Sequence, residues 1–142
     1  MKRSEIIGEA KTWMGTKWQH QTALKGVACD CLGLVIGIAR KFGQEVDAAD
    51  LNYSQMPHHF EEKLYEKMKK YVIEIPVSEA KPGDILLFGF SPDWPAYHVG
   101  IVSYDGFIIH TWMDVGKVVE TRLDSQWLAN LRYAFRYQGV ED

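Results

Sequence analysis

The chain has 142 residues, and a chain of this length forms one domain, because separate cores usually arise only beyond roughly 250 residues. Hydrophobic residues make up 46% and charged residues 25%, which excludes disordered, collagen-like and disulfide-dense proteins. The net charge of −3 argues against nucleic acid as a partner, because neutralising phosphates needs clustered Lys and Arg. We therefore expect a single domain over residues 1–142.

The first residues do not have the pattern of a secretory signal peptide. Ser4, Glu5 and Glu9 interrupt the apolar stretch that such a peptide requires. The longest mainly apolar run, residues 31–39, is shorter than the roughly 20 residues that cross a bilayer. The expected place of synthesis is the cytoplasm, and no membrane insertion is expected.

Residues 4–14 predict an amphipathic helix, because apolar side chains recur there at helical spacing. Ser4 is its expected N-cap and Gly15 its expected end. A polar connection follows over residues 15–30. The run 31–42 then predicts a second and more buried helix.

Asp30 and Gly43 mark the two ends of this second helix, as an N-cap and a C-terminal glycine do. A long irregular segment is expected from Gln44 to His59. Beyond it, an apolar stripe from Phe60 to Tyr71 predicts a third helix with a charged, solvated face.

From Val72 onward the pattern changes to short β-branched and aromatic runs separated by Pro, Gly, Asp and Ser. These runs predict strands at 72–77, 84–90, 98–104, 106–112, 117–123 and 133–138. Residues 124–130 predict a helical turn before the last strand. Helices followed by strands, without alternation, predict an α+β fold in which N-terminal helices pack on an antiparallel sheet of about five to six strands.

Cys31 is the first candidate for chemistry, because it follows Asp30 at the expected start of a helix. The helix dipole and the unpaired backbone N–H groups there favour a thiolate over a thiol. A nucleophilic cysteine needs this help or a nearby base, since a free thiol has a pKa of about 8.5. The alternative is a small buried hydrophobic residue.

His98 and His110 add a base and an orienting group. His98 begins one predicted strand and His110 lies near the end of the next, so two adjacent antiparallel strands carry both. Their exact pairing depends on the turn between the strands. With Cys31 they supply nucleophile, base and orienting group for covalent acyl transfer. The alternative for each histidine is a hydrogen-bonded residue at a sheet margin.

The ordered motifs of nearly the whole chain resemble a known family, the NlpC/p60 cysteine peptidases, papain-like enzymes that cut peptidoglycan stem peptides. The likeness rests on GTKW at 15–18, DCLGLV at 30–35, KPGDILLF at 81–88, and HVGIV at 98–102 followed by IIHTW. It implies a hydrolase (a thiol protease) with Cys31 as nucleophile, His98 as general base and acid, and His110 as the residue that orients His98.

A narrower likeness concerns residues 18–35, WQHQTALKGVACDCLGLV, which resemble the branch found in tailed phages and gene transfer agents. It implies a cell-wall peptidase delivered by a virion or built into its tail, with phage or gene-transfer-agent tail proteins as partners. The rival function is a structural tail-tip or assembly subunit whose active site is weak or unused.

Trp18 departs from the family pattern, in which many relatives carry a tyrosine that helps to polarise the active site. Either Trp18 lines the groove, or the oxyanion donor comes from Gln19, His20 or Gln21 together with the backbone N–H of Cys31. We expect the backbone N–H. The oxyanion and groove candidates are Trp18, Gln19, Asp30, Trp94 and Trp112, and each aromatic ring among them is equally compatible with the core. Trp94, between two prolines, is the candidate for gating the cleft.

The chemistry that the likeness implies is amide hydrolysis through a Cys31 thioester, commonly at the γ-D-glutamyl to diamino-acid bond, without metal or other cofactor. Cys29 has no place in this pattern and is expected to be structural. Zinc binding by Cys29, Cys31, His98 and His110 is a rival, because these residue types are acceptable ligands.

Overall fold

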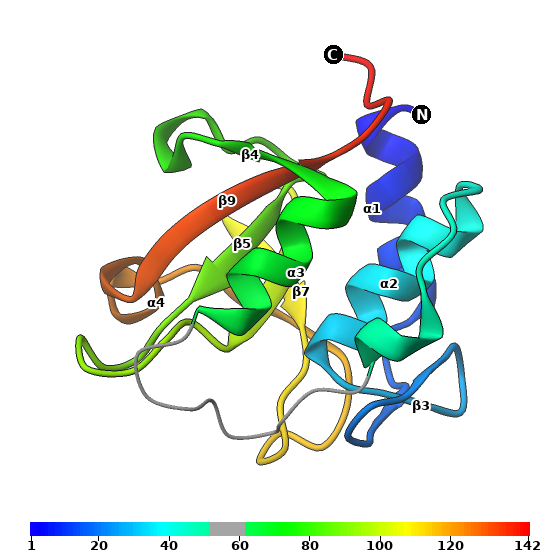
Figure 1. Ribbon diagram of the computed structural model, residues 1–142, viewed down its shortest axis with the longest axis horizontal. Helices are drawn as coiled ribbons and strands as arrows, with labels where there is room; N and C mark the ends of the chain where they lie inside the picture. Colours follow the sequence, from blue (N-terminus) through cyan, green and yellow to red (C-terminus); the bar gives the residue numbers. More distant parts are fainter. Residues whose placement is uncertain (52–61) are drawn as a thin grey trace.

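The computed structural model describes residues 1–51 and 62–142 and forms an α+β fold, with helices packed on a curved sheet (Figure 1). The helical elements are α1 (Arg3–Thr12), α2 (Cys31–Lys41), η1 (Ala48–Leu51), α3 (Lys63–Tyr71), η2 (Val77–Glu79) and α4 (Ser125–Ala129). The termini lie side by side, because the Met1 amino group donates to the Gly139 carbonyl at 2.8 Å.

The main sheet has six strands in the order β4-β9-β5-β6-β7-β8, and all neighbouring pairs are antiparallel. The strands are β4 (Val72–Ile75), β5 (Ile85–Phe88), β6 (His98–Val102), β7 (Phe107–His110), β8 (Val119–Arg122) and β9 (Leu131–Tyr137). Each lies within or overlaps one of the six predicted runs. The expected fold class is therefore confirmed, as is the helical turn before the last strand.

The core lies mainly between the sheet and the first three α-helices. Its fully buried side chains include Leu34 and Ile38 of α2 and Ile101 of β6. A smaller cluster on the opposite face of the sheet includes Phe88 and Ile108, with partly buried Trp127 packed against it. Both faces of the central strands are thus covered, which explains why β5 is buried at every position.

The N-cap of α1 is Lys2, so the prediction of Ser4 is wrong by two residues. The Lys2 backbone N–H donates to the Glu5 carboxylate at 2.8 Å. The Arg3 guanidinium reaches the Pro82 carbonyl and the Asp84 carboxylate, both at 2.9 Å. These contacts fix the first turn earlier than Ser4, which lies inside the helix. The helix also ends two residues before the expected Met14, because α1 stops at Thr12 with Trp13 as its C-cap, and Gly15, with φ +86°, lies in the turn that follows.

The connection 15–30 contains a small sheet that sequence patterning did not predict. Its strands are β1 (Lys17–Trp18), β2 (Ala23–Leu24) and β3 (Ala28–Cys29), in the order β1-β3-β2. Two-residue strands are too short to show an alternating pattern, so their formation depends on tertiary contacts. This sheet leads directly into α2, and its strands β2 and β3 pack against that helix.

The expected third helix is confirmed as α3, which begins at Lys63. Part of that prediction, Phe60, lies outside the described residues, as does most of the long segment expected up to His59. Within 1–51 and 62–142, each helix is too short or too polar to cross a bilayer.

Candidate active site

Cys31 is the first residue of α2, and Asp30 caps the helix as predicted. One oxygen of the Asp30 carboxylate accepts the Gly33 backbone N–H at 2.7 Å. The other accepts the Gln21 backbone N–H at 2.7 Å and lies 3.7 Å from His20 Nδ1. The buried carboxylate therefore fixes the helix start and also ties the preceding loop to it.

Gly33 shows how closely that loop approaches the helix. A Cβ at this position would lie 2.0 Å from the Thr22 carbonyl oxygen, which accepts the Asp30 backbone N–H at 3.1 Å. No side chain fits there. The glycine of the DCLGLV motif is thus needed so that the loop can pass over the first turn of α2 and hold Cys31 in place.

The Cys31 thiol lies against the backbone on both sides of His98. Its Sγ is 3.9 Å from the Tyr97 carbonyl oxygen, to which the S–H donates. The Val99 backbone N–H acts on the same sulfur and lowers the thiol pKa. The packing of α2 on β6 therefore brings the predicted nucleophile to the first residue of the strand that carries the predicted base.

His98 and His110 form a buried pair. His98 Nε2 lies 2.9 Å from His110 Nδ1, and the side chains belong to adjacent antiparallel strands, as expected. Gly100 is the residue directly opposite His110, so His98 is its diagonal neighbour on the same face of the sheet. The register that the sequence left open thus brings the imidazoles into contact.

Sequence reasoning missed two residues that contact this pair, Thr121 and Trp127. His110 Nε2 lies 2.7 Å from Thr121 Oγ1 on β8. The Trp127 ring of α4 has its centroid 5.3 Å from that of His98 and 4.9 Å from that of His110. Both contacts depend on the paths of the connections 111–118 and 123–130, the second of which contains α4, and no short-range pattern reveals those paths.

The pKa of Cys31 is raised to about 12, which is opposite to the direction expected from its position at a helix start. Burial is the main cause, and the adjacent Asp30 carboxylate adds to it. The backbone N–H groups of Cys31 and Leu32 do act in the expected direction, but they are outweighed. The site at neutral pH therefore holds a thiol.

The two histidines are also uncharged at neutral pH. Burial, with a smaller contribution from His110, lowers the pKa of His98 to about 3. Burial lowers the pKa of His110 to about 4. Aromatic rings account for much of this burial, because Phe88, Trp112 and Trp127 surround His98 with centroids 5.3–6.0 Å away. The resting pair is therefore two neutral imidazoles, each with one N–H.

The predicted groove residues divide into two groups. Trp112 is brought to the histidines, with its ring centroid 4.8 Å from that of His110, and Asp30 adjoins Cys31. Trp18 pairs with Cys29 across β1 and β3, and the Gln19 backbone N–H donates to the Cys29 carbonyl at 3.0 Å. Trp94 lies in the loop between β5 and β6, where its backbone N–H donates to the Ser91 carbonyl at 3.2 Å.

Cys29 is fully buried on β3, and burial raises the pKa of its thiol to about 12. Such a thiol has little nucleophilic character. Within the described parts of the chain, no group of three or more His, Cys, Asp or Glu residues has the arrangement to hold a metal ion. The geometry therefore gives the rival zinc site no support.

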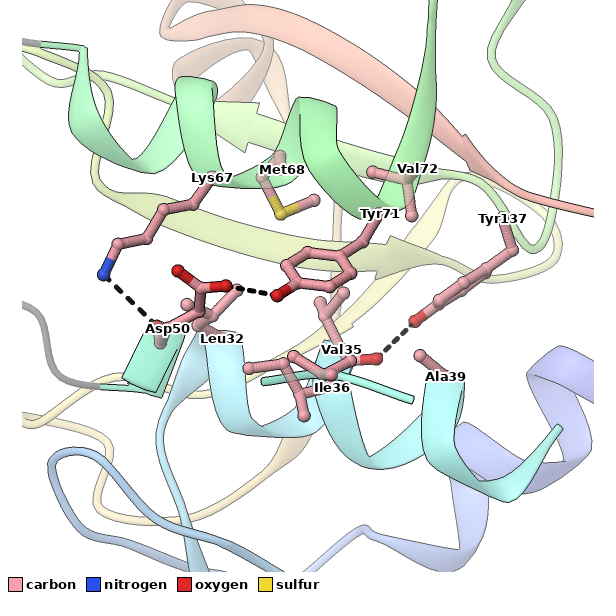
Figure 2. A pocket seen from close by; sticks show the side chains of 11 residues that line it. Leu32, Val35, Ile36, Ala39, Asp50, Lys67, Met68, Tyr71, Val72 and Tyr137 are labelled. Atoms are coloured by element: carbon pink, nitrogen blue, oxygen red, sulfur yellow. Dashed lines mark hydrogen bonds between the residues drawn. The ribbon is translucent and has the colours of Figure 1, made fainter. Parts of the chain in front are cut away.

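A separate hollow lies between α2, η1 and α3 (Figure 2). Its walls are Leu32, Val35, Ile36, Ala39, Val46, Asp50, Lys67, Met68, Tyr71, Val72 and Tyr137. Polar contacts already join several of them: Tyr71 donates to the Asp50 carboxylate, and Lys67 donates to the Asp50 carbonyl at 3.2 Å. The hollow does not include Cys31 or the histidines.

No family model matches the chain, and no curated protein matches it in sequence. Solved structures do match. The NlpC/p60 domain of the peptidoglycan hydrolase SagA is 24% identical, with a TM-score of 0.68, over 95% of this chain and 98% of that one. An NlpC/p60 family protein from Bacillus cereus is 18% identical, with a TM-score of 0.72, over 95% of this chain but 40% of that one.

A third match has a different function. RipD from Mycobacterium tuberculosis, described as a non-catalytic NlpC/p60 domain protein adapted to peptidoglycan binding, is 15% identical, with a TM-score of 0.63. The match covers 94% of this chain and 95% of that one. At these identities the likeness establishes the architecture that the sequence motifs implied. The chain has the fold of NlpC/p60 domains.

Proposed function

We propose that the protein is a cysteine peptidase that hydrolyses amide bonds in peptidoglycan stem peptides. In this proposal Cys31 is the nucleophile, His98 the general base and acid, and His110 the residue that orients His98. The observation that carries it is the Cys31 thiol lying against the Tyr97 carbonyl, next to a His98 that contacts His110 at 2.9 Å. The NlpC/p60 fold supports peptidoglycan as the substrate class.

The first step forms a thioester. His98 Nε2 is engaged with His110, so Nδ1 is the atom that takes the Cys31 proton as the sulfur attacks the carbonyl carbon. Because thiol and imidazole are both neutral at rest, proton transfer accompanies the attack. The carbon–nitrogen bond then breaks, and His98 returns the proton to the leaving amine.

The second step releases the acid. Water attacks the thioester carbonyl and gives a proton to His98 Nδ1, which passes it to the departing Cys31 sulfur. The backbone N–H of Cys31 belongs to the first turn of α2, where N–H groups have no partner within the helix. It is our candidate for stabilising the oxyanion in both steps.

The test is incubation of purified protein with defined stem-peptide fragments, followed by mass spectrometry of the products. Cys31→Ala is expected to abolish cleavage, whereas the matched Cys29→Ala variant and added chelator are expected to leave it unchanged. Cleavage that survives in Cys31→Ala, or that stops on chelation, would contradict the proposal. The position of the cut tests the finer expectation of the γ-D-glutamyl to diamino-acid bond.

The alternative is a subunit that binds peptidoglycan or a neighbouring tail protein without cutting. One observation favours it: RipD, described as non-catalytic, has the same fold. If wild type leaves every fragment intact but sediments with insoluble peptidoglycan, this alternative replaces the peptidase. Association with a phage or gene-transfer-agent tail rests on the likeness of residues 18–35, and co-purification with assembled particles would test it.

A further inference from the structure

Thr121 extends the line of polar contacts beyond the two histidines. It lies on β8, next to β7, where the register pairs Ile108 with Thr121 and His110 with Val119. His110 and Thr121 are therefore diagonal neighbours on one face, and His110 Nε2 lies 2.7 Å from Thr121 Oγ1. His98, His110 and Thr121 thus form one continuous hydrogen-bonded chain of side chains across three strands.

The direction of the hydrogen bonds in this chain decides whether His98 can act as a base. A neutral imidazole carries one N–H and one bare nitrogen, so each of the two contacts needs one hydrogen. In the first arrangement, His98 Nε2–H donates to His110 Nδ1, and His110 Nε2–H donates to Thr121. His98 Nδ1 is then bare and accepts the thiol proton.

The second arrangement is reversed. The Thr121 hydroxyl donates to His110 Nε2, and His110 Nδ1–H donates to His98 Nε2. His98 then carries its hydrogen on Nδ1 and has no site for a proton from Cys31. The two arrangements use the same atoms and distances. For the proposed reaction to begin, the Thr121 hydroxyl therefore has to accept a hydrogen bond from His110.

We propose that Thr121 is a positioning residue whose hydroxyl accepts the Nε2–H of His110 and thereby keeps Nδ1 of His98 free of hydrogen. Thr121 is only partly buried, so its own hydroxyl hydrogen can turn toward solvent while the oxygen accepts. The inference rests on the proposed peptidase function for its catalytic meaning, but the hydrogen positions it specifies do not depend on activity.

Thr121→Val is the informative substitution, because valine keeps the shape and the β-branch that suit a strand. It leaves His110 Nε2–H facing a methyl group, and an unpaired buried N–H is unfavourable. The hydrogen is therefore expected to move to Nδ1 of His110, which reverses the direction of the hydrogen bonds. Thr121→Ser keeps the hydroxyl and is expected to behave as wild type.

Thr111→Val is a matched control. Thr111 adjoins His110 and is fully buried, and its hydroxyl has no hydrogen-bond partner within the part of the chain that the structure describes. The same exchange there removes a hydroxyl of equal size next to the site but outside the chain of contacts. It is expected to leave both imidazoles unchanged.

The first measurement is NMR of protein labelled with ¹⁵N at histidine, which distinguishes a bare ring nitrogen from one that carries hydrogen. In wild type the hydrogen is expected on Nε2 of both histidines, and in Thr121→Val on Nδ1 of both. Hydrogen on Nδ1 of His98 in wild type would overturn the inference, as would identical spectra for wild type and Thr121→Val. The wild-type spectrum decides even where the variant does not fold.

The second measurement is cleavage of a stem-peptide fragment. Thr121→Val is expected to lower kcat by about 10- to 100-fold with little change in KM, whereas Thr121→Ser and Thr111→Val keep the wild-type rate. Equal losses in Thr121→Val and Thr111→Val would contradict the inference. If wild type cleaves no fragment, the proposed function fails, and the NMR result still decides where the hydrogens lie.

Discussion

Gly100 lies directly opposite His110 in the β6–β7 pair, and a Cβ added at Gly100 would lie 2.9 Å from the Cβ of His110. The same Cβ would lie 2.7 Å from Cδ1 of Ile108. The glycine of the HVGIV motif therefore leaves space on the sheet face that the two imidazoles use to reach each other.

Gly100→Ala is expected to disturb this arrangement. The added methyl group has to displace the stem of His110, and overpacking of this kind costs about 1–3 kcal/mol of unfolding free energy. Because the His98–His110 contact is displaced as well, catalysis is expected to fall by more than the stability loss explains. Chemical denaturation and cleavage assays on the same preparation measure both effects.

Gly8→Ala provides the control for that substitution. Gly8 lies in α1, and an added Cβ there would meet no atom within 4 Å. Alanine in place of glycine in a helix interior is expected to stabilise the fold by about 0.5–1 kcal/mol. Destabilisation by both variants to the same degree would show that a Cβ at Gly100 causes no particular crowding.

Asp84 is a second motif residue whose role is structural. Its fully buried carboxylate pairs with Arg3 of α1 and Arg136 of β9, each at 2.9 Å. Asp84→Asn leaves two guanidinium groups without their buried partner, and the expected loss of unfolding free energy is about 3–5 kcal/mol. Thermal or urea unfolding measures it.

Asp142→Asn is the matched comparison, because Asp142 pairs with the same Arg3 at 2.7 Å but its side chain is 53% exposed. Solvent screens this pair, so the expected loss is at most about 1 kcal/mol. Equal effects at the two aspartates would contradict a structural role that depends on the burial of Asp84.

The buried histidines make stability depend on pH. Their pKa values are lowered to about 3 for His98 and about 4 for His110, whereas histidines in the unfolded chain titrate near 6.5. Between these values the unfolded chain binds more protons. The contribution of the two neutral histidines to the unfolding free energy is therefore complete above pH 6.5, and it is lost as pH falls toward 3 to 4.

Each such histidine lowers the unfolding free energy by about 1.4 kcal/mol for each pH unit between pH 6 and 4. His110→Asn removes one titrating group, so its unfolding free energy is expected to fall less steeply in this range. Urea titrations at several pH values test this expectation. Parallel curves for wild type and His110→Asn would mean that His110 is not held neutral in the folded protein.

The Cys31 thiol is expected to react slowly with iodoacetamide at neutral pH, because its pKa is raised to about 12. Only the thiolate reacts, so the rate is expected to rise about tenfold for each pH unit from 7 to 10. Cys31→Ala removes this reaction, and the fully buried Cys29 is expected to stay unlabelled in the folded chain. A fast rate that is constant from pH 5 to 8 would indicate a preformed thiolate–imidazolium pair instead.

Local patterns were sufficient for most of the fold, and they made Cys31, His98 and His110 the candidates whose roles we propose. The apolar spacing after Asp30 predicted α2, and the short β-branched and aromatic runs around His98 and His110, with a turn between them, predicted β6 and β7 as neighbours. These features depend on contacts within one turn or one hairpin. The two-residue strands were missed because they are too short to show a pattern, and the N-cap of α1 was missed because Arg3 is held by Pro82 and Asp84, far along the chain.

The sequence by itself determined the α+β class, the helix start that carries Cys31 and the two strands that carry the histidines, since each is encoded in a short stretch of side chains. Only the tertiary structure decided the register that joins His98 to His110 and the placement of Thr121 and Trp127 beside them. It also reversed the expected direction of the Cys31 pKa. The physical reason is that register and burial are set by every element that packs around a residue, whereas helix and strand formation respond mainly to its neighbours in the chain.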